Sequence, residues 1–203
     1  MSGRERFGLA ALAYVSRMTN APDAYALGFL LGPRINAGGR IGHSSLGVNL
    51  LTSHDHGEAE RLAAELDALN TQRKAIELEV TTAAIAQIEK QYGDAELPPV
   101  IMVAGEDWNQ GVIGISAGRL KEHFDRPAAV ISVTTTADGK KIGKASARSV
   151  APFQLGAAVI AAHQHGLLEA GGGHDMAAGF TIDMEQLDAF QAFMIARARA
   201  DFG

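Results

Sequence analysis

The sequence contains no cysteine. This absence excludes disulfide bonds, thiolate zinc sites and cysteine nucleophiles together, so any metal ion would have to be held by His, Asp or Glu side chains. A chain without cysteine also suits a reducing compartment. We therefore expect a cytoplasmic protein.

Long apolar runs are missing as well. The runs at residues 99–104 and 128–133 are far shorter than the roughly 20 residues that a helix needs to cross a bilayer, and no signal sequence opens the chain. We expect neither a membrane span nor export. Since 47% of the 203 residues are hydrophobic, the chain can still bury a substantial core.

The sequence also lacks the motifs of common hydrolytic centres. It has no Asp-His-His triplet, no Asp-x-Asp pair, no carboxylate cluster for a two-metal site and no Gly-x-Ser-x-Gly elbow. His54, Asp55 and His56 are possible ligands, but three consecutive residues on a helix point in different directions, so we interpret them as a helix start. The chain alone is expected to hold no metal and to lack a catalytic centre.

Positive charge is scarce overall, because the net charge is −5, and this argues against a protein that coats nucleic acid through a broad basic surface. The distribution is uneven, however. Residues 118–150 contain seven basic and three acidic residues, whereas residues 54–91 contain eight acidic and four basic residues. The sequence therefore predicts a local basic region after an acidic helix.

Residues 54–92 have the three- and four-residue apolar spacing of a helix, without proline and with a single glycine near the start. A helix of about 38 residues would be roughly 57 Å long and typically connects two bodies. The alternative is an ordinary helix broken near Asn70 and Thr71. Before it, helical patterns at residues 6–18 and 23–31 are followed by a predicted glycine-rich turn at residues 32–42.

After the helix, strand and helix patterns alternate. Strands are predicted at residues 100–104, 129–133, 140–149 and 178–182, and helices at 112–124, 153–165 and 184–200. The predicted fold is α/β: a long connecting helix, residues 53–93, followed by a compact domain, residues 94–203, with a mixed sheet flanked by helices. Residues 1–52 are expected to be the end of a larger domain.

Three successive glycines, Gly171, Gly172 and Gly173, precede His174. Glycines destabilise regular elements, so something must offset them. Backbone amides without side chains can approach an anion and form a nest around a phosphate, to which His174 could donate. A tight turn with a capping histidine explains the same residues.

Lys144, Ser146 and Arg148 alternate along a predicted strand, so they share one face. An ammonium, a hydroxyl and a guanidinium on one face are suited to a sugar–phosphate backbone. An ordinary solvated strand, protected from edge pairing by its charges, is the alternative.

Three further side chains have two interpretations each. Trp108, between a strand and a helix, could stack on a base or pack in the core. Arg34 and Arg40 flank the glycine-rich segment and could hold a phosphate or neutralise the acidic helix that follows.

Six segments, taken in order, resemble the RecJ family of the DHH phosphoesterases. They are residues 32–42, 70–74, 108–115, 126–127, 146–149 and 171–179. The last part of the chain resembles the DHHA1 domain, which related phosphodiesterases and alanyl-tRNA synthetases also carry, and the Gly-Pro-Arg-Ile-Asn segment at residues 32–36 separates RecJ from those relatives. Two departures are mild: Ala-Gly-Gly at residues 37–39, and Lys144-Ala145 where a glycine commonly precedes the serine.

The resemblance implies a manganese- or magnesium-dependent exonuclease that degrades single-stranded DNA from its 5′ end in recombination and repair. In that family, two domains joined by a long helix face each other across a groove, and the metal ligands belong to the first domain. Residues 1–52 would be the C-terminal remnant of that DHH domain and residues 94–203 the DHHA1 domain. The expected partners are single-stranded DNA and the missing DHH domain; the family's usual oligonucleotide-binding domain is also missing.

The resemblance also suggests residue roles. Arg148 and the loop from Gly171 to His174 would grip DNA phosphates, with His174 near the reaction centre as the catalytic candidate. Arg34 and Arg40 would lie beside the groove on the side of the missing domain. The full set of expected nucleic-acid contacts is Arg148, Ser146, Ser149, Lys144, Gly171, Gly172, Gly173, His174, Arg34, Arg40 and Trp108.

Two other functions fit the same residues. The chain could be a stand-alone binding module for single-stranded DNA or RNA. It could also be part of a phosphodiesterase that acts on nanoRNA or a nucleotide bisphosphate. Asp-rich motifs encoded before Met1 would favour the exonuclease, and their absence would favour the binding module.

Overall fold

The computed structural model describes residues 6–203 of the chain. These residues form two compact units, divided between Ile76 and Glu77 inside the long helix. Each unit is described by itself below. In the described residues, no helix combines the length and the apolar character that a membrane crossing requires.

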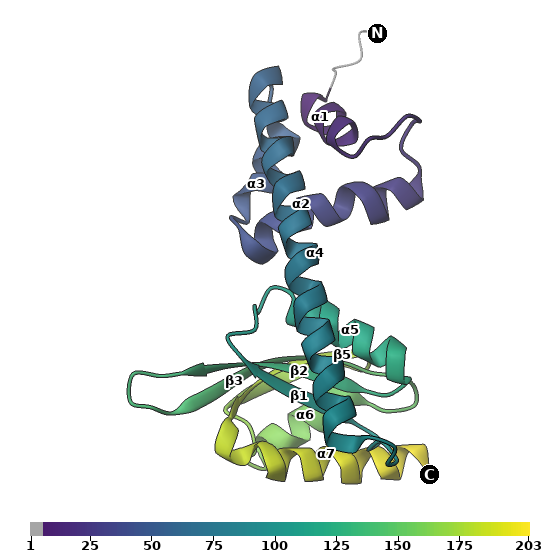
Figure 1. The fold of residues 1–203 in the computed structure, drawn as a ribbon, viewed down its shortest axis with the longest axis vertical. Coiled ribbons are helices and arrows are strands. Elements are labelled where there is room, and N and C mark those ends of the chain that lie inside the picture. Colours follow the sequence, from purple (N-terminus) through teal and green to yellow (C-terminus); the bar gives the residue numbers. More distant parts are fainter. Residues whose placement is uncertain (1–5) are drawn as a thin grey trace. The chain divides into compact units, whose positions relative to one another are not determined.

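The first unit is helical (Figure 1). It contains α1 (Phe7–Val15), the π-helix η1 (Ala26–Leu31), α2 (Gly32–Ile41), α3 (Ser45–Thr52) and the first part of α4 (His56–Tyr92). Its core is formed by leucines from four of these helices, because Leu12, Leu31, Leu50, Leu62 and Leu66 are all at most 2% exposed. The helix α3 was not predicted from the sequence.

The predicted turn at residues 32–42 is wrong, because this segment forms α2. Pro33 lies in the first turn of the helix, where a backbone N–H has no partner inside the helix, so proline is tolerated there. Gly38 lets the helix pack closely: a Cβ atom at this position would lie 3.0 Å from the His43 carbonyl oxygen and 3.2 Å from Leu66 Cδ2. Tertiary packing therefore overrides the low helix propensity of the glycines.

The long helix α4 runs unbroken from His56 to Tyr92. The predicted helix is confirmed, and the alternative with a break near Asn70 is wrong. Asp55 caps its start, since Asp55 Oδ1 accepts the Glu58 N–H at 2.6 Å. Gly93, with a φ of +53°, follows the last helical residue.

The second unit contains a five-stranded sheet in the order β1-β2-β3-β5-β4. Its strands are β1 (Ile101–Glu106), β2 (Ala128–Thr135), β3 (Lys141–Arg148), β4 (Ala170–His174) and β5 (Ala177–Asp183), and its helices are α5 (Ile113–Phe124), α6 (Leu155–Gln164), the 3₁₀ helix η2 (Met184–Gln186) and α7 (Leu187–Phe202). β1 and β2 are parallel and the other pairs are antiparallel. The predicted mixed α/β fold is confirmed.

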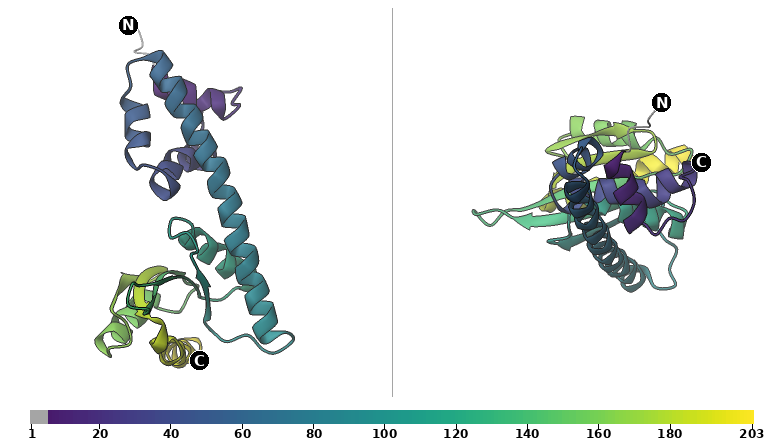
Figure 2. Two further views of the ribbon diagram at one scale, coloured as in Figure 1. Left: turned by 60° about the vertical axis from the view of Figure 1, so that its left-hand side comes forward. Right: turned by 90° about the horizontal axis from the view of Figure 1, so that it is seen from above.

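The two faces of this sheet differ in their covering. One face packs against α6 and α7, and its core includes Ala145, Ala147, Phe180 and Ile182. The helix α5 packs against β2 and β3 on the other face, and the last part of α4 lies beside α5, where Thr81 donates to Ser116 (Figures 1 and 2). Because side chains alternate along a strand, β3 supplies both faces at once.

Candidate nucleic-acid interface

The face of the sheet that carries α5 leaves part of β3, β5 and β4 open. We call this part the open sheet face. It is formed by Lys144, Ser146 and Arg148 of β3, Ala177, Gly179 and Thr181 of β5, and Gly172 and His174 of β4. The register aligns these residues in rows across three strands, so that residues from segments 30 positions apart become neighbours.

The middle row of the open sheet face has almost no side chains. Ser146 pairs with Gly179, which pairs with Gly172. A Cβ atom at Gly172 would meet nothing within 4 Å, and one at Gly179 would meet only the Ala145 carbonyl oxygen, at 3.5 Å. The backbone itself therefore forms the floor of a shallow depression of about 390 Å³, which Lys144 and Thr181 also line.

The predicted triglycine loop is wrong, because Gly171, Gly172 and Gly173 lie in β4 and pair with β5. Two of the glycines are explained by the helix α6. A Cβ atom at Gly171 would lie 2.8 Å from Val159 Cγ1, and a Cβ atom at Gly156 of α6 would lie 2.8 Å from the Gly173 carbonyl carbon. Only Gly172 faces open space, so close packing and an open floor together account for the three glycines.

Arg148 is held firmly at the edge of this floor. Its Nη1 donates to Ser146 Oγ at 3.1 Å and to the Ala147 carbonyl oxygen at 2.8 Å, and the residue is half-buried. Gly114 of α5 lies directly over both side chains: a Cβ atom there would be 2.9 Å from Ser146 Oγ and 3.2 Å from Arg148 Nη2. The guanidinium is therefore preorganised by neighbours on two elements.

His174 ends β4 and is exposed. It pairs with Ala177, which in turn pairs with Arg148, so the histidine and the arginine stand in one row at the same end of the open sheet face. The structure thus brings together Lys144, Ser146, Arg148, Gly172 and His174.

Two of the expected contacts lie elsewhere. Ser149 is only 1% exposed, and its hydroxyl donates to the Phe153 carbonyl oxygen at 2.9 Å, so this side chain serves the core and not the open sheet face. Trp108 lies in the loop after β1, half-buried, with its ring against the backbone of Gly105. This position matches the packing interpretation of the tryptophan.

Arg34 and Arg40 belong to α2 in the first unit. Arg34 Nε lies 2.7 Å from Asp67 Oδ1 of α4, and its Nη1 donates to the Leu30 carbonyl oxygen at 2.7 Å. Arg34 therefore neutralises a carboxylate of the acidic helix. Arg40 is exposed in the last turn of α2.

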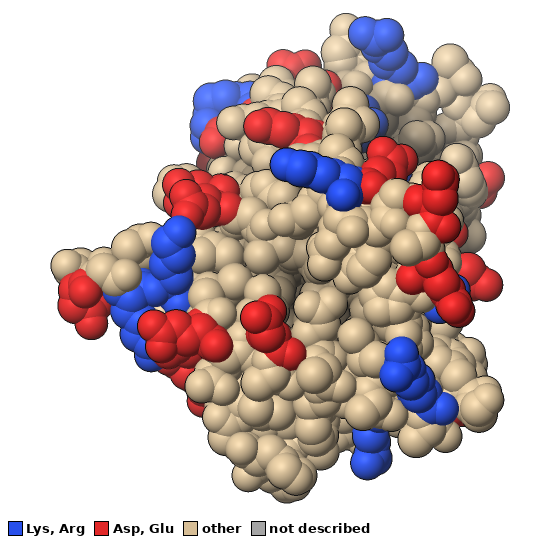
Figure 3. Space-filling model, turned by 60° about the horizontal axis from the view of Figure 1, so that its bottom comes forward, with Lys and Arg blue, Asp and Glu red and all other residues tan. Residues whose placement is uncertain are grey.

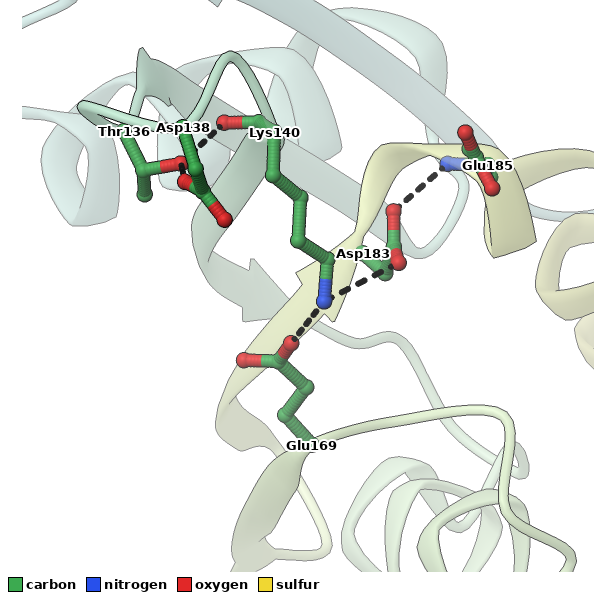
Figure 4. A network of polar contacts seen from close by, with 6 residues as sticks. All are labelled: Thr136, Asp138, Lys140, Glu169, Asp183 and Glu185. Carbon is green, nitrogen blue, oxygen red and sulfur yellow. Dashed lines mark hydrogen bonds and ion pairs between the residues drawn. The ribbon is translucent and has the colours of Figure 1, made fainter.

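The basic region predicted at residues 118–150 is largely neutralised by distant carboxylates. Lys140 Nζ lies 2.9 Å from Glu169 Oε1 and 3.1 Å from Asp183 Oδ2 (Figure 4). Lys141 pairs with Glu106 at 2.5 Å, and Arg119 pairs with Glu77 at 3.4 Å. On the molecular face drawn in Figure 3, blue and red side chains are interspersed and no broad blue patch is present.

These pairs shift the protonation equilibria of their members. The amide of Glu185 and the ammonium of Lys140 hold the pKa of Asp183 below its usual value, and the carboxylates of Glu169 and Asp183 raise the pKa of Lys140. Lys141 lowers the pKa of Glu106. Because these groups are exposed, salt screens their interactions, and they stabilise the hairpin of β2 and β3 only modestly.

No group of three or more His, Asp or Glu side chains gathers anywhere in residues 6–203 in a way that could hold a metal ion. The described residues therefore do not form the site of a divalent metal, and no chemical step is assigned to one here. The open sheet face supplies donors, positive charge and an unobstructed floor.

Sequence reasoning missed Gly179, Thr181 and Gly114 as parts of this site. Gly179 and Thr181 share the alternation that places Lys144 and Ser146 on one face, but their alignment depends on which strands are neighbours. Gly114 is important only because α5 crosses β3 at that residue. No local sequence signal contains this information.

Comparison with known proteins adds a family. Residues 97–200 match the model of the DHHA1 domain. The single-stranded-DNA-specific exonuclease RecJ of Salmonella typhimurium is 40% identical over 194 residues, which are 94% of this chain and 33% of that protein. RecJ of Bacillus subtilis is 42% identical over 161 residues, or 79% of this chain and 20% of that protein. The chain thus spans a third or less of the length of these relatives.

Solved structures agree with the sequence relatives. RecJ from Thermus thermophilus in complex with Mg²⁺ superimposes with a TM-score of 0.81 and 32% identity, covering 97% of this chain and 29% of that one. A structure of exonuclease RecJ bound to manganese gives a TM-score of 0.76 and 30% identity, covering 96% of this chain and 46% of that one.

The ion pairs around Lys140 and Lys141 predict two separable pKa changes. Lys140→Met should raise the pKa of Asp183 only partly, because the Glu185 amide still donates to the carboxylate. Lys141→Met should return the pKa of Glu106 to its usual value, because Lys141 causes both lowering effects. Carboxyl carbon NMR during a pH titration measures each shift, and each variant is the control for the other. A Glu106 shift in Lys140→Met would contradict the assignment.

The packing of α5 on β3 predicts opposite effects of two similar substitutions. Gly114→Ala should lower the free energy of unfolding by about 1–3 kcal/mol, because its Cβ would collide with Ser146 and Arg148. Gly118→Ala, one turn later, meets nothing within 4 Å and should raise it by about 0.5–1 kcal/mol. Urea unfolding followed by Trp108 fluorescence reports on this unit, and equal effects of the two substitutions would refute the close contact.

Proposed function

The chain belongs to the DHHA1 domain family and is homologous to part of the RecJ single-stranded-DNA-specific exonucleases, and from this premise we propose that it is the half of such a nuclease that binds the DNA strand. The strand would lie across the open sheet face with its phosphates beside β3. We further propose that the parent enzyme acts from the 5′ end in DNA repair and recombination and is cytoplasmic.

The observation that supports this function best is the bare row from Ser146 through Gly179 to Gly172. Glycine in a strand normally weakens the sheet, and it is expected where another backbone approaches closely. Gly172 and Gly179 meet no steric requirement within the protein that would exclude a methyl group. An approaching sugar–phosphate backbone gives their bareness a physical reason.

Arg148 and Lys144 supply the charge in this proposal. The planar guanidinium of Arg148 matches two phosphate oxygens, and its hydrogen bonds to Ser146 and Ala147 reduce the entropy lost on binding. Lys144 is exposed two residues away on the same strand and can follow the backbone as a point charge. Such contacts position a strand without reading its sequence.

His174 would stand nearest the scissile phosphodiester, because it ends β4 beside Arg148. A neutral or charged imidazole there can donate to a phosphate oxygen. The divalent metals of the parent enzyme, Mg²⁺ or Mn²⁺, would be held by its DHH domain, which lies outside this chain. The two metal complexes of RecJ relatives support this division of labour.

The division of the parent enzyme also gives roles to the segments of the chain. We propose that residues 1–52 are the end of the DHH domain, that residues 53–93 connect the two domains, and that residues 94–203 are the DHHA1 domain. The family match to residues 97–200 supports the last boundary. Arg40 would then lie on the side of the DHH domain.

The proposed phosphate contact predicts a sequence-independent loss of binding. Arg148→Ala should weaken binding of single-stranded oligonucleotides by about tenfold and reduce the slope of log K against log salt by about 0.7, because one phosphate contact is lost. Arg197→Ala, on the exposed side of α7 behind the sheet, is the matched control. Fluorescence anisotropy over a salt series gives both values. Equal slopes for Arg148→Ala and Arg197→Ala would remove Arg148 from the interface.

The isolated chain should not hydrolyse single-stranded DNA, even with added Mn²⁺, because the described residues contain no cluster of metal ligands. Release of nucleotides from a 5′-labelled strand measures this directly. A full-length relative provides the positive control. Turnover by the pure chain that persists through repurification would overturn the proposed division between strand binding and hydrolysis.

A further inference from the structure

A second polar cavity lies at the other end of the unit's helices, and none of its lining residues belongs to the open sheet face. A pocket of about 640 Å³ is lined by Pro99, Phe124, Asp125, Arg126, Arg199, Phe202 and Gly203. A neighbouring pocket of about 320 Å³ shares Pro99, Arg126 and Arg199 with it. The shared residues make the two hollows one continuous cavity, bounded by the ends of α5 and α7 and by the loop before β1.

The two arginines of this cavity differ from the other basic residues of the unit. Lys140, Lys141 and Arg119 have carboxylate partners, whereas Arg126 and Arg199 have neither an ion pair nor a hydrogen bond within residues 6–203. An arginine near a helix end often donates to the last carbonyl groups. Neither guanidinium does so here, although Arg199 lies in the last turn of α7. Two guanidinium forks on one cavity are therefore available to an anion.

The rest of the lining limits what the anion can be attached to. Phe124 and Phe202 present aromatic surface, against which a planar ring can pack. Asp125 and Glu96 place carboxylates on the same cavity, and these accept hydrogen bonds from hydroxyl or amino groups. A bare inorganic anion would use only the arginines, and it would be repelled by both carboxylates.

We propose that this cavity binds a nucleoside monophosphate. The phosphate would pair with Arg126 and Arg199, the base would pack against the phenylalanines, and the sugar hydroxyl or base amino groups would donate to Asp125 or Glu96. The combined size suits such a ligand, because pockets for small organic ligands measure about 300–1,000 Å³. The cavity contains an anion site, an aromatic wall and acceptors together, and a nucleotide is the ligand class that uses all three.

The experiment titrates the isotope-labelled chain with dAMP, deoxyadenosine or inorganic phosphate and follows the amide resonances. dAMP should shift the resonances of Phe124, Arg126, Arg199 and Phe202, and deoxyadenosine and phosphate should each bind at least about tenfold more weakly. Phosphate that binds as well as dAMP would overturn the nucleotide assignment. Shifts confined to Gly172, Gly179 and their neighbours would overturn the separate cavity.

Matched variants test the arginines. Arg199→Gln and Arg126→Gln should each weaken dAMP binding by at least about tenfold, because each loses a charged hydrogen bond. Arg197→Gln, two residues earlier on α7 and outside the cavity, should change it by less than about twofold. If Arg126→Gln does not fold, the exposed Arg199 still decides the outcome. No saturable dAMP binding, or equal losses for Arg197→Gln and Arg199→Gln, would refute the proposal.

Discussion

β3 lies between β2 and β5, and its side chains must satisfy opposite requirements on the two faces of the sheet. Ala145 and Ala147 are small enough for the core under α6 and α7, while Lys144, Ser146 and Arg148 point to the other side. A shift of the register by one residue would bury the two cations and expose the alanines. The core therefore fixes the orientation of the polar residues, and the candidate interface depends on this one alternation.

Glycine positions complete that arrangement, and they do so for different reasons. Gly114 and Gly156 let α5 and α6 approach the sheet closely on its two faces. Gly172 and Gly179 are bare on the side where no helix covers them. The first pair is required by packing inside the protein. The second pair costs stability without such a requirement, and this contrast directs attention to a ligand on the open sheet face.

Periodicity in the sequence was sufficient for the long helix α4 and for the alternation of β3, because both patterns depend on neighbours along the chain. It failed where distant residues decide. The helix α2 depends on Gly38 packing against Leu66, and β4 depends on pairing with β5. The apparent basic region was misleading because Lys140 and Glu169 lie 29 residues apart in sequence. Ser149 follows the alternating residues directly, yet its hydroxyl turns inward to Phe153.

The charge of the unit is mostly balanced locally, so a strand would be recognised by a few placed groups and not by a broad field. The most direct measurement is an NMR titration of the labelled chain with a short oligothymidylate at low salt. We predict that the amides of Lys144, Ser146, Gly172 and Gly179 shift together with one affinity, while those of α6 and α7 do not. Shifts centred on α6 or α7, with the open sheet face unchanged, would contradict the proposed interface.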